Sequence, residues 1–125
     1  MANAKLWFLP MALLPLAVPA MDIQFAGFST VAVPGDAGLV GLHGACQAAF
    51  GNKARMCVAD ELVRTPEIVG FTQELSAWVQ PGSSRFPCSG WASPIGSGTV
   101  LDARTMAFAN RRCGEALPVT CCQER

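Results

Sequence analysis

The sequence has little of the chemistry that nucleic-acid-binding surfaces and catalytic sites depend on. Only one of its 125 residues is histidine, and charged residues make up 14%, with nine basic against nine acidic side chains. A neutral surface offers no electrostatic footprint for DNA, RNA or anionic membranes. We therefore expect no nucleic-acid partner.

The chain also lacks the cysteine spacing of a zinc site. No two cysteines form a C-x-x-C pair, and His43 is the only histidine that could complete a ligand set. We therefore expect neither a metal nor another cofactor. The six cysteines are Cys46, Cys57, Cys88, Cys113, Cys121 and Cys122.

The first twenty residues are typical of a secretory signal. Residues 1–20 carry one positive charge at Lys5, then an apolar run broken by prolines, and end on Val18-Pro19-Ala20. We expect cleavage there and a single domain over residues 21–125; an uncleaved N-terminal anchor is the alternative. Export to a secreted, periplasmic or cell-surface location places the even cysteine count in an oxidising compartment, which favours three disulfides.

Hydrophobic periodicity predicts an α+β fold in which two helices pack on small antiparallel sheets. Residues 25–35 are typical of an opening strand. Helical spacing over 36–51, with Asp36 as N-cap and Gly51 as C-cap, places Leu39, Leu42 and Cys46 on the buried side. A second helix is expected from Thr65, with Pro66 at its first position, to about residue 77.

The second half of the chain predicts a long loop and short strands. Residues 80–98, "QPGSSRFPCSGWASPIGSG", are rich in proline, glycine and serine, and Cys88 lies in their middle. Such a long loop in a small domain is either functional or disordered, and a disulfide argues against disorder. Strands are expected at 99–102, at 105–109 and at 117–121.

Cys121 and Cys122 are adjacent, so on a strand their side chains point to opposite faces. Cys121 shares a face with Leu117 and Val119, which favours a core contact with Cys46 on the first helix. Cys57 would then bond Cys122, and Cys88 would bond Cys113. Six cysteines allow fifteen pairings, so this is a hypothesis, and an exchange of partners between Cys121 and Cys122 is the first alternative.

The order of these features resembles the C-type lectin-like domain. The segments "CQAAFG", "ARMC", "AWVQP", "CSGW" and "PVTCC" are similar to a lectin-like domain of unknown function found in exported bacterial proteins. The resemblance covers residues 25–123. It implies two disulfides, Cys46–Cys121 and Cys88–Cys113, and a long loop that carries the binding surface.

The resemblance does not extend to the calcium site of sugar-binding members. Those members carry Glu-Pro-Asn or Gln-Pro-Asp in the long loop and Trp-Asn-Asp before the penultimate cysteine. This sequence has Gln80-Pro81-Gly82 and "FANRRC", and Asp102 is the only acidic residue between 80 and 113. Calcium requires several oxygen ligands, usually with carboxylates among them, so we expect any binding to be calcium-independent.

Catalytic motifs are lacking as well. His43 has no recognisable nucleophile or orienting partner and is interpreted as a packed or solvent-facing helix residue. Ser89 and Ser93 lack the G-x-S-x-G context of a catalytic serine. All cysteines are expected to be paired. The chain is therefore predicted not to be an enzyme.

The remaining hypothesis is recognition through the loop around residues 80–98. Aromatic rings with polar neighbours suit sugars and peptides, although core packing is favoured for Trp78 and Trp91, and ordinary solvation for the polar residues. The expected partner is a glycan or a protein surface. The alternative is a structural or assembly unit of a cell-surface or secreted structure. The candidate binding residues are Gln80, Ser83, Ser84, Arg85, Phe86, Ser89, Trp91 and Ser93.

Overall fold

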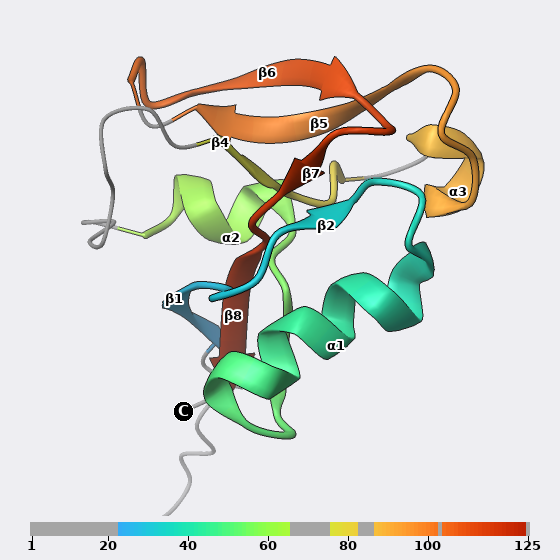
Figure 1. Ribbon diagram of the computed structural model, residues 1–125. Helices are drawn as coiled ribbons and strands as arrows, with labels where there is room; N and C mark the ends of the chain where they lie inside the picture. The colour runs from blue at the N-terminus through green and yellow to red at the C-terminus, as the bar shows by residue number, and fades with distance from the viewer. Residues whose placement is uncertain (1–22, 66–75, 83–86, 103, 125) are drawn as a thin grey trace, which may run out of the picture.

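A computed structural model describes residues 23–65, 76–82, 87–102 and 104–124 (Figure 1). These residues form an α+β fold of short helices and small antiparallel sheets, which confirms the predicted class. The elements in chain order are β1 Ile23–Phe28, β2 Val33–Pro34, α1 Gly38–Phe50, β3 Ala54–Met56, α2 Ala59–Val63, β4 Ser76–Trp78, α3 Cys88–Trp91, β5 Ser97–Asp102, β6 Ala107–Arg112, β7 Ala116–Leu117 and β8 Thr120–Glu124.

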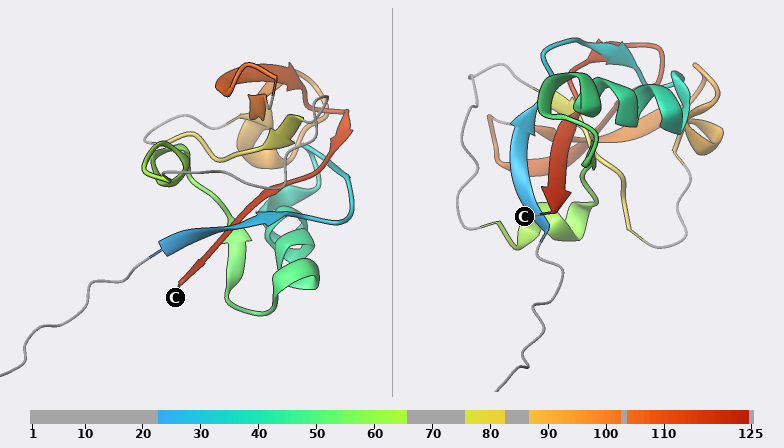
Figure 2. Two further views of the ribbon diagram at one scale, coloured as in Figure 1. Left: turned by 90° about the vertical axis from the view of Figure 1, so that its left-hand side faces the viewer. Right: turned by 90° about the horizontal axis from the view of Figure 1, so that it is seen from below.

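The strands form three antiparallel sheets, with orders β1-β8-β3, β2-β7 and β4-β5-β6. The last strand, β8, is the centre of the first sheet, and its neighbour β1 is the first strand of the chain, as the right-hand view of Figure 2 shows. Helix α1 packs beside β3 and β8, while the β4-β5-β6 sheet lies at the other end of the molecule (Figure 1). No helix within the described ranges is long and apolar enough to cross a membrane.

Helix α1 lies within the predicted range and ends at Gly51 as expected, but it begins later. Ala37, not Asp36, is the N-cap, and no side chain caps the helix there. Leu39 is 45% exposed, so the buried side begins only at Leu42 and continues through Cys46. The first turn of α1 therefore extends past the core that the rest of the helix covers.

The second predicted helix is wrong at its C-terminal end, and residues 66–75 lie outside the described part of the chain. Ser76–Trp78 is strand β4, in which Ala77 pairs with Leu101 of β5. A short apolar segment buried on both sides has no periodicity that separates strand from helix. The sequence reasoning also missed α2, where the Glu61 carboxylate accepts a hydrogen bond from the Val58 N–H at 2.9 Å and so begins the helix.

The predicted opening strand is divided into β1, which pairs with β8, and β2, which pairs with β7. Ser29 continues the contacts of β1 by one residue. The Ser29 N–H donates to the Val119 carbonyl at 2.9 Å, and the Ser29 hydroxyl accepts from the Val119 N–H at 2.9 Å. Strand β5 begins at Ser97, inside the expected loop, and β6 continues to Arg112, past the predicted end at residue 109. The single strand predicted at 117–121 is divided between β7 and β8.

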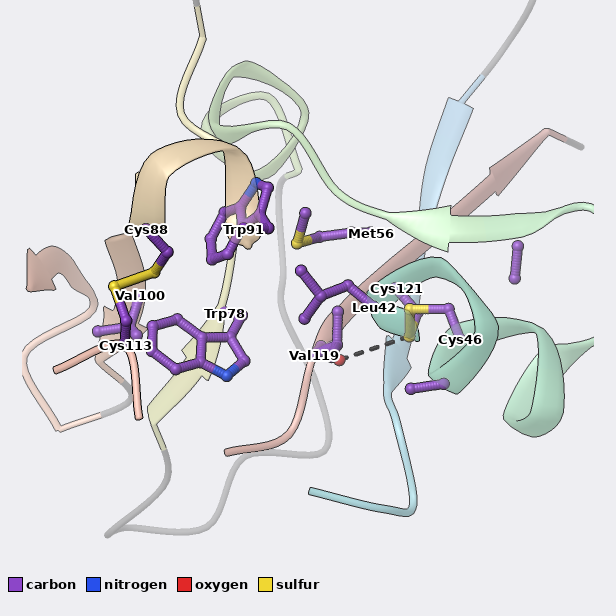
Figure 3. Packing of buried hydrophobic residues seen from close by; sticks show 12 residues of the cluster. Leu42, Cys46, Met56, Trp78, Cys88, Trp91, Val100, Cys113, Val119 and Cys121 are labelled. Atoms are coloured by element: carbon purple, nitrogen blue, oxygen red, sulfur yellow. Dashed lines mark hydrogen bonds between the residues drawn. A yellow bond between two sulfur atoms is a disulfide. The ribbon is translucent and has the colours of Figure 1, made fainter. Parts of the chain in front are cut away.

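Two hydrophobic clusters lie on opposite faces of β8. The first contains Val119 and Cys121 together with Trp78 and Trp91, whose rings meet edge to face with centroids 5.8 Å apart (Figure 3). The second contains Cys122, with Cys57 and Leu62 beside it. The predicted alternation of residues 117–122 is therefore present, with Leu117 packed against the first cluster.

All six cysteines are paired. The disulfides join Cys46 to Cys121, Cys57 to Cys122 and Cys88 to Cys113, the three pairs expected from the sequence, with Cα–Cα distances of 5.4, 5.0 and 5.7 Å. They link α1 to β8, the segment after β3 to β8, and α3 to the end of β6. Oxidised cysteines of this number indicate an oxidising compartment.

Candidate functional site

The long loop contains one turn of left-handed helix, which is α3. The backbone φ angles are +56° at Cys88, +53° at Ser89, +80° at Gly90 and +66° at Trp91. The turn is closed by a hydrogen bond of 2.8 Å from the Ala92 N–H to the Cys88 carbonyl. Left-handed helix costs roughly 1–2 kcal/mol per residue for L-amino acids, and three of these four residues are not glycine.

Two anchors hold this turn in place. Cys88 is buried and bonded to Cys113. The Trp91 ring is 1% exposed, and its indole N–H donates to the Gln80 side-chain carbonyl at 2.6 Å. Figure 3 shows both anchors beside Trp78. The strained conformation is therefore fixed at both ends of the turn by buried contacts.

Between the anchors, the turn exposes Ser89 and Gly90 to solvent. Ile95 follows at 80% exposure. The backbone at Ile95 is held by a hydrogen bond of 3.1 Å from the Ile95 N–H to the Ser93 hydroxyl. Among its described residues, the loop thus presents the Ser89 hydroxyl, the Gly90 backbone and the large apolar Ile95 side chain on a rigid base.

The predicted binding residues have different environments. Ser89 is exposed, and Ser93 is half-buried and bonded within the loop. The side chains of Gln80 and Trp91 are hydrogen-bonded to each other. The Trp91 ring is buried and offers no face to a ligand, so Trp91 is not a contact residue. Its burial agrees with the core packing that the sequence favoured for it. The other four, Ser83, Ser84, Arg85 and Phe86, lie outside the described residues.

Sequence reasoning missed Gly90 and Ile95 as surface groups of this loop. Ile95 stands between proline and glycine and has serines on both sides at strand spacing, so no strand periodicity predicts its burial, and this was the only signal in the sequence. The positive φ angles had no signal, because serine, tryptophan and cysteine rarely adopt them. Only tertiary anchors make this conformation stable.

The described residues offer no carboxylate cluster near this loop. Asp102 lies at the far end of β5, where its side chain accepts the Arg104 N–H at 2.9 Å. One group of three potential metal-ligating side chains exists elsewhere, namely Cys57, Glu61 and Cys122, with ligand atoms within 4.8 Å of one another. Both of its sulfurs belong to a disulfide, so they are not thiolates and cannot bind a metal as such.

His43 has a structural contact. Its Nδ1 accepts a hydrogen bond from the Met56 N–H at 3.1 Å, which links α1 to β3. Burial, with the nearby charge of Arg55 as the second cause, lowers the pKa of His43 below its usual value of 6.5. The imidazole is therefore neutral at pH 7, and one of its nitrogens is occupied by the backbone.

A concave surface lies at the end of the first sheet where β1 begins and β8 ends. It has a volume of about 460 Å³, is open to solvent, and is lined by Ile23, Lys53, Arg55 and Glu124. Arg55 is committed to Glu61, with a hydrogen bond of 3.0 Å between Nη1 and Oε1, and that contact raises the pKa of Arg55. Because Glu61 neutralises Arg55, and Lys53 and Glu124 carry opposite charges, this hollow favours neither an anionic nor a cationic ligand.

Comparison of the chain with protein-family models, with curated proteins and with solved structures gave no match. The site is therefore described by its own geometry: a disulfide-anchored left-handed turn with a small exposed polar and apolar surface.

Proposed function

We propose that this protein is an exported, non-catalytic recognition module of C-type lectin-like architecture. It binds a glycan or a protein surface through the loop of residues 80–98, without calcium. The disulfides Cys46–Cys121 and Cys88–Cys113 support this architecture, because they are the two that the sequence resemblance implied. The pairing of first and last strands beside α1 is compatible with the same architecture.

The single observation that carries the binding proposal is the left-handed turn at Cys88–Trp91. Backbone strain of this kind persists only where surrounding contacts impose it, and it concentrates at binding and catalytic sites. Here the imposed conformation brings out Ser89 and Gly90, the two residues of the turn that are exposed. A rigid surface loses little conformational entropy on binding, which raises affinity.

The chemistry of this surface favours a neutral ligand. Ser89 can donate and accept a hydrogen bond, and the exposed backbone around Gly90 permits close approach of a ligand. Ile95 adds an apolar contact at 80% exposure. Sugars combine hydroxyl groups with apolar ring faces, so they match a surface of this composition.

The absence of catalysis is part of the proposal and rests on the available side chains. All six cysteine sulfurs are in disulfides, so no thiolate can act as nucleophile. His43 lies on α1, and its Nδ1 is occupied by a hydrogen bond from the Met56 N–H. Export follows from the same disulfides together with residues 1–20.

A glycan array probed with the mature chain, residues 21–125, tests the proposal. We expect binding that is unchanged by EDTA and reduced at least tenfold by Ile95→Asp. Val63→Asp is the matched control, because Val63 is 69% exposed on α2 and outside the loop. Loss of binding with EDTA would contradict calcium independence, and equal binding by both variants would contradict the loop as the site. If no glycan binds, a panel of extracellular proteins tests the other ligand class with the same variants, and failure there overturns the proposal.

A further inference from the structure

Strand β6 is an edge strand of its three-stranded sheet. In the β4-β5-β6 sheet, the opposite edge strand β4 is covered by bridges from Trp78 to Val119 and from Gln80 to Val58. Of the elements that the structure describes, none pairs with the outer side of β6, which borders the molecule at the top of Figure 1. An uncovered edge presents unpaired backbone groups that can accept another strand.

The register shows which backbone groups face outward. The Cys113 N–H donates to the Gly96 carbonyl at 3.0 Å, so that pair is hydrogen-bonded. Hydrogen-bonded and non-hydrogen-bonded pairs alternate along an antiparallel ladder. The continuous register therefore directs the backbone groups of Ala107, Ala109 and Arg111 toward β5, and those of Phe108, Asn110 and Arg112 away from it.

We propose that this edge pairs with β6 of a second copy of the chain, antiparallel and about a two-fold axis at Asn110. In this register Asn110 faces the partner's Asn110, and Phe108 faces the partner's Arg112. In this register Phe108, Asn110 and Arg112 all lie in hydrogen-bonded pairs with the partner strand. The pairing is isologous and closes on itself, so it gives a dimer and no fibre.

The side chains of β6 are complementary to themselves in this register. Arg112 is exposed, and it would lie opposite the partner's Phe108, which is 40% exposed and can accept a cation–π contact. No two like charges are directly opposite, an arrangement that would be destabilising in a sheet. The facing asparagine amides can hydrogen-bond to each other.

The remaining charge near the strand centre is already neutralised. Arg111 forms a two-pronged ion pair with Glu115 of its own chain, with 3.2 Å between Nε and Oε2. It would lie opposite the partner's Ala109. The two Arg111 side chains lie diagonally across the two-fold axis from each other. Because each is paired with the Glu115 carboxylate of its own chain, their approach does not bring two unpaired charges together.

The occupant favoured by this pattern is a second copy, although an acidic extended peptide could use the same edge. Such a peptide would need a strongly positive strand. In β6, Arg111 is paired with Glu115, Arg112 also interacts electrostatically with that carboxylate, and the other half of the strand contains Phe108. Met106, 53% exposed, extends the apolar surface at the other end. The contact is small, so we expect a weak dimer that forms in a concentration-dependent way.

Amide hydrogen exchange, followed residue by residue by NMR on the mature chain at increasing concentrations, tests the register. Ala107, Ala109 and Arg111 serve as internal controls, because they bond to β5 and should be protected at every concentration. Phe108, Asn110 and Arg112 should become at least tenfold slower as the dimer forms in analytical ultracentrifugation. A dimer that leaves those three amides unprotected would overturn the proposed interface.

A pair of charge substitutions tests the two-fold axis. Asn110→Asp places two carboxylates opposite each other and should raise the dimer dissociation constant at least tenfold at pH 7, with recovery near pH 3. Gln24→Glu makes the same amide-to-carboxylate change at an exposed position of β1 and should leave the constant unchanged. Unaltered disulfides and circular dichroism show that both variants fold.

The proposal is overturned if the chain stays monomeric at millimolar concentration, or if the two variants dimerise equally. Protection of the three outward amides only on addition of a poly-glutamate peptide would likewise overturn self-association and assign the edge to an acidic partner. These outcomes are independent of the glycan array, because β6 and the loop of residues 80–98 are tested by different substitutions.

Discussion

Cys121 and Cys122 are consecutive on β8, yet their sulfurs lie in different hydrophobic clusters. Cys121 bonds Cys46 of α1 on one face of the strand, and Cys122 bonds Cys57 on the other. Adjacent strand residues point to opposite faces, so two neighbouring cysteines can reach partners that one cysteine could not. The central strand is therefore crosslinked through both of its faces.

Removing a disulfide should destabilise the fold by an amount that grows with the logarithm of the length of the loop it closes. In the chain-entropy treatment, a sequence separation of 75 for Cys46–Cys121 corresponds to about 4.5 kcal/mol, and 25 for Cys88–Cys113 to about 3.5 kcal/mol. We expect the double alanine variants to lose up to these amounts of unfolding free energy in urea denaturation. The Cys88→Ala/Cys113→Ala variant should also lose ligand binding while the remaining two disulfides still form.

A contrary result for this prediction is well defined. If Cys88→Ala/Cys113→Ala keeps full binding, the disulfide does not hold the left-handed turn. Peptide mapping without reduction is the control. Both the variant and the wild type should give one fragment in which the peptides of Cys46 and Cys57 are linked to the peptide that carries Cys121 and Cys122.

Gln80→Leu should destabilise the protein by about 1–3 kcal/mol, because the buried Trp91 indole N–H loses its acceptor. Gln80→Glu keeps an oxygen acceptor at the same reach and should retain more of that stability. Urea denaturation followed by tryptophan fluorescence measures both variants. Equal losses in the two would show that the hydrogen bond is not what stabilises this site.

Alanine substitutions at two glycines distinguish the cost of backbone strain from the cost of a steric clash. A Cβ at Gly90 would meet no atom within 4 Å, so Gly90→Ala should cost only about 1–2 kcal/mol for its φ of +80°. A Cβ at Gly98 would lie 2.9 Å from the Trp78 ring and 3.1 Å from the Cys88 sulfur, so Gly98→Ala must displace the core. We expect altered near-ultraviolet circular dichroism for Gly98→Ala alone. A spectral change in Gly90→Ala would contradict the open space around that residue.

Stability should decrease as the pH falls below 6.5, because His43 is held neutral in the fold. Its folded-state pKa is lowered, by burial first and by Arg55 second. Below 6.5 the unfolded chain therefore binds a proton that the folded protein does not, until the folded-state pKa is reached. Above 6.5 this contribution to stability is complete.

Urea denaturation between pH 7.5 and 5 measures this effect. His43→Asn keeps an acceptor for the Met56 N–H but cannot titrate, so its stability should be flat over that range. A decline of the same size in both proteins would assign the pH dependence to other groups. The lowered pKa of Glu61 acts at more acidic pH, below its usual 4.5, and does not overlap this window.

The misassigned elements are those whose local pattern is ambiguous. Ala77 and Trp78 are buried in a three-residue strand, but in the sequence Trp78 also continues the helical spacing of Ile68, Phe71 and Leu75. Helix α2 is five residues long and depends on the Glu61 carboxylate at its start, which is a contact and not a periodicity. The composition of residues 80–98 predicted a loop there, anchored by Cys88, but it did not predict the left-handed turn at Cys88–Trp91.

The sequence by itself determined the α+β class, the span of α1 to within two residues at its start, and the division of Cys121 and Cys122 between two faces. Each of these follows from local periodicity, which depends only on the geometry of strands and helices. The tertiary structure alone decided the left-handed turn at Cys88–Trp91, the burial of Trp91 against Gln80 and the open edge of β6. Those features depend on contacts between segments distant in the chain, which stabilise conformations that the local sequence disfavours.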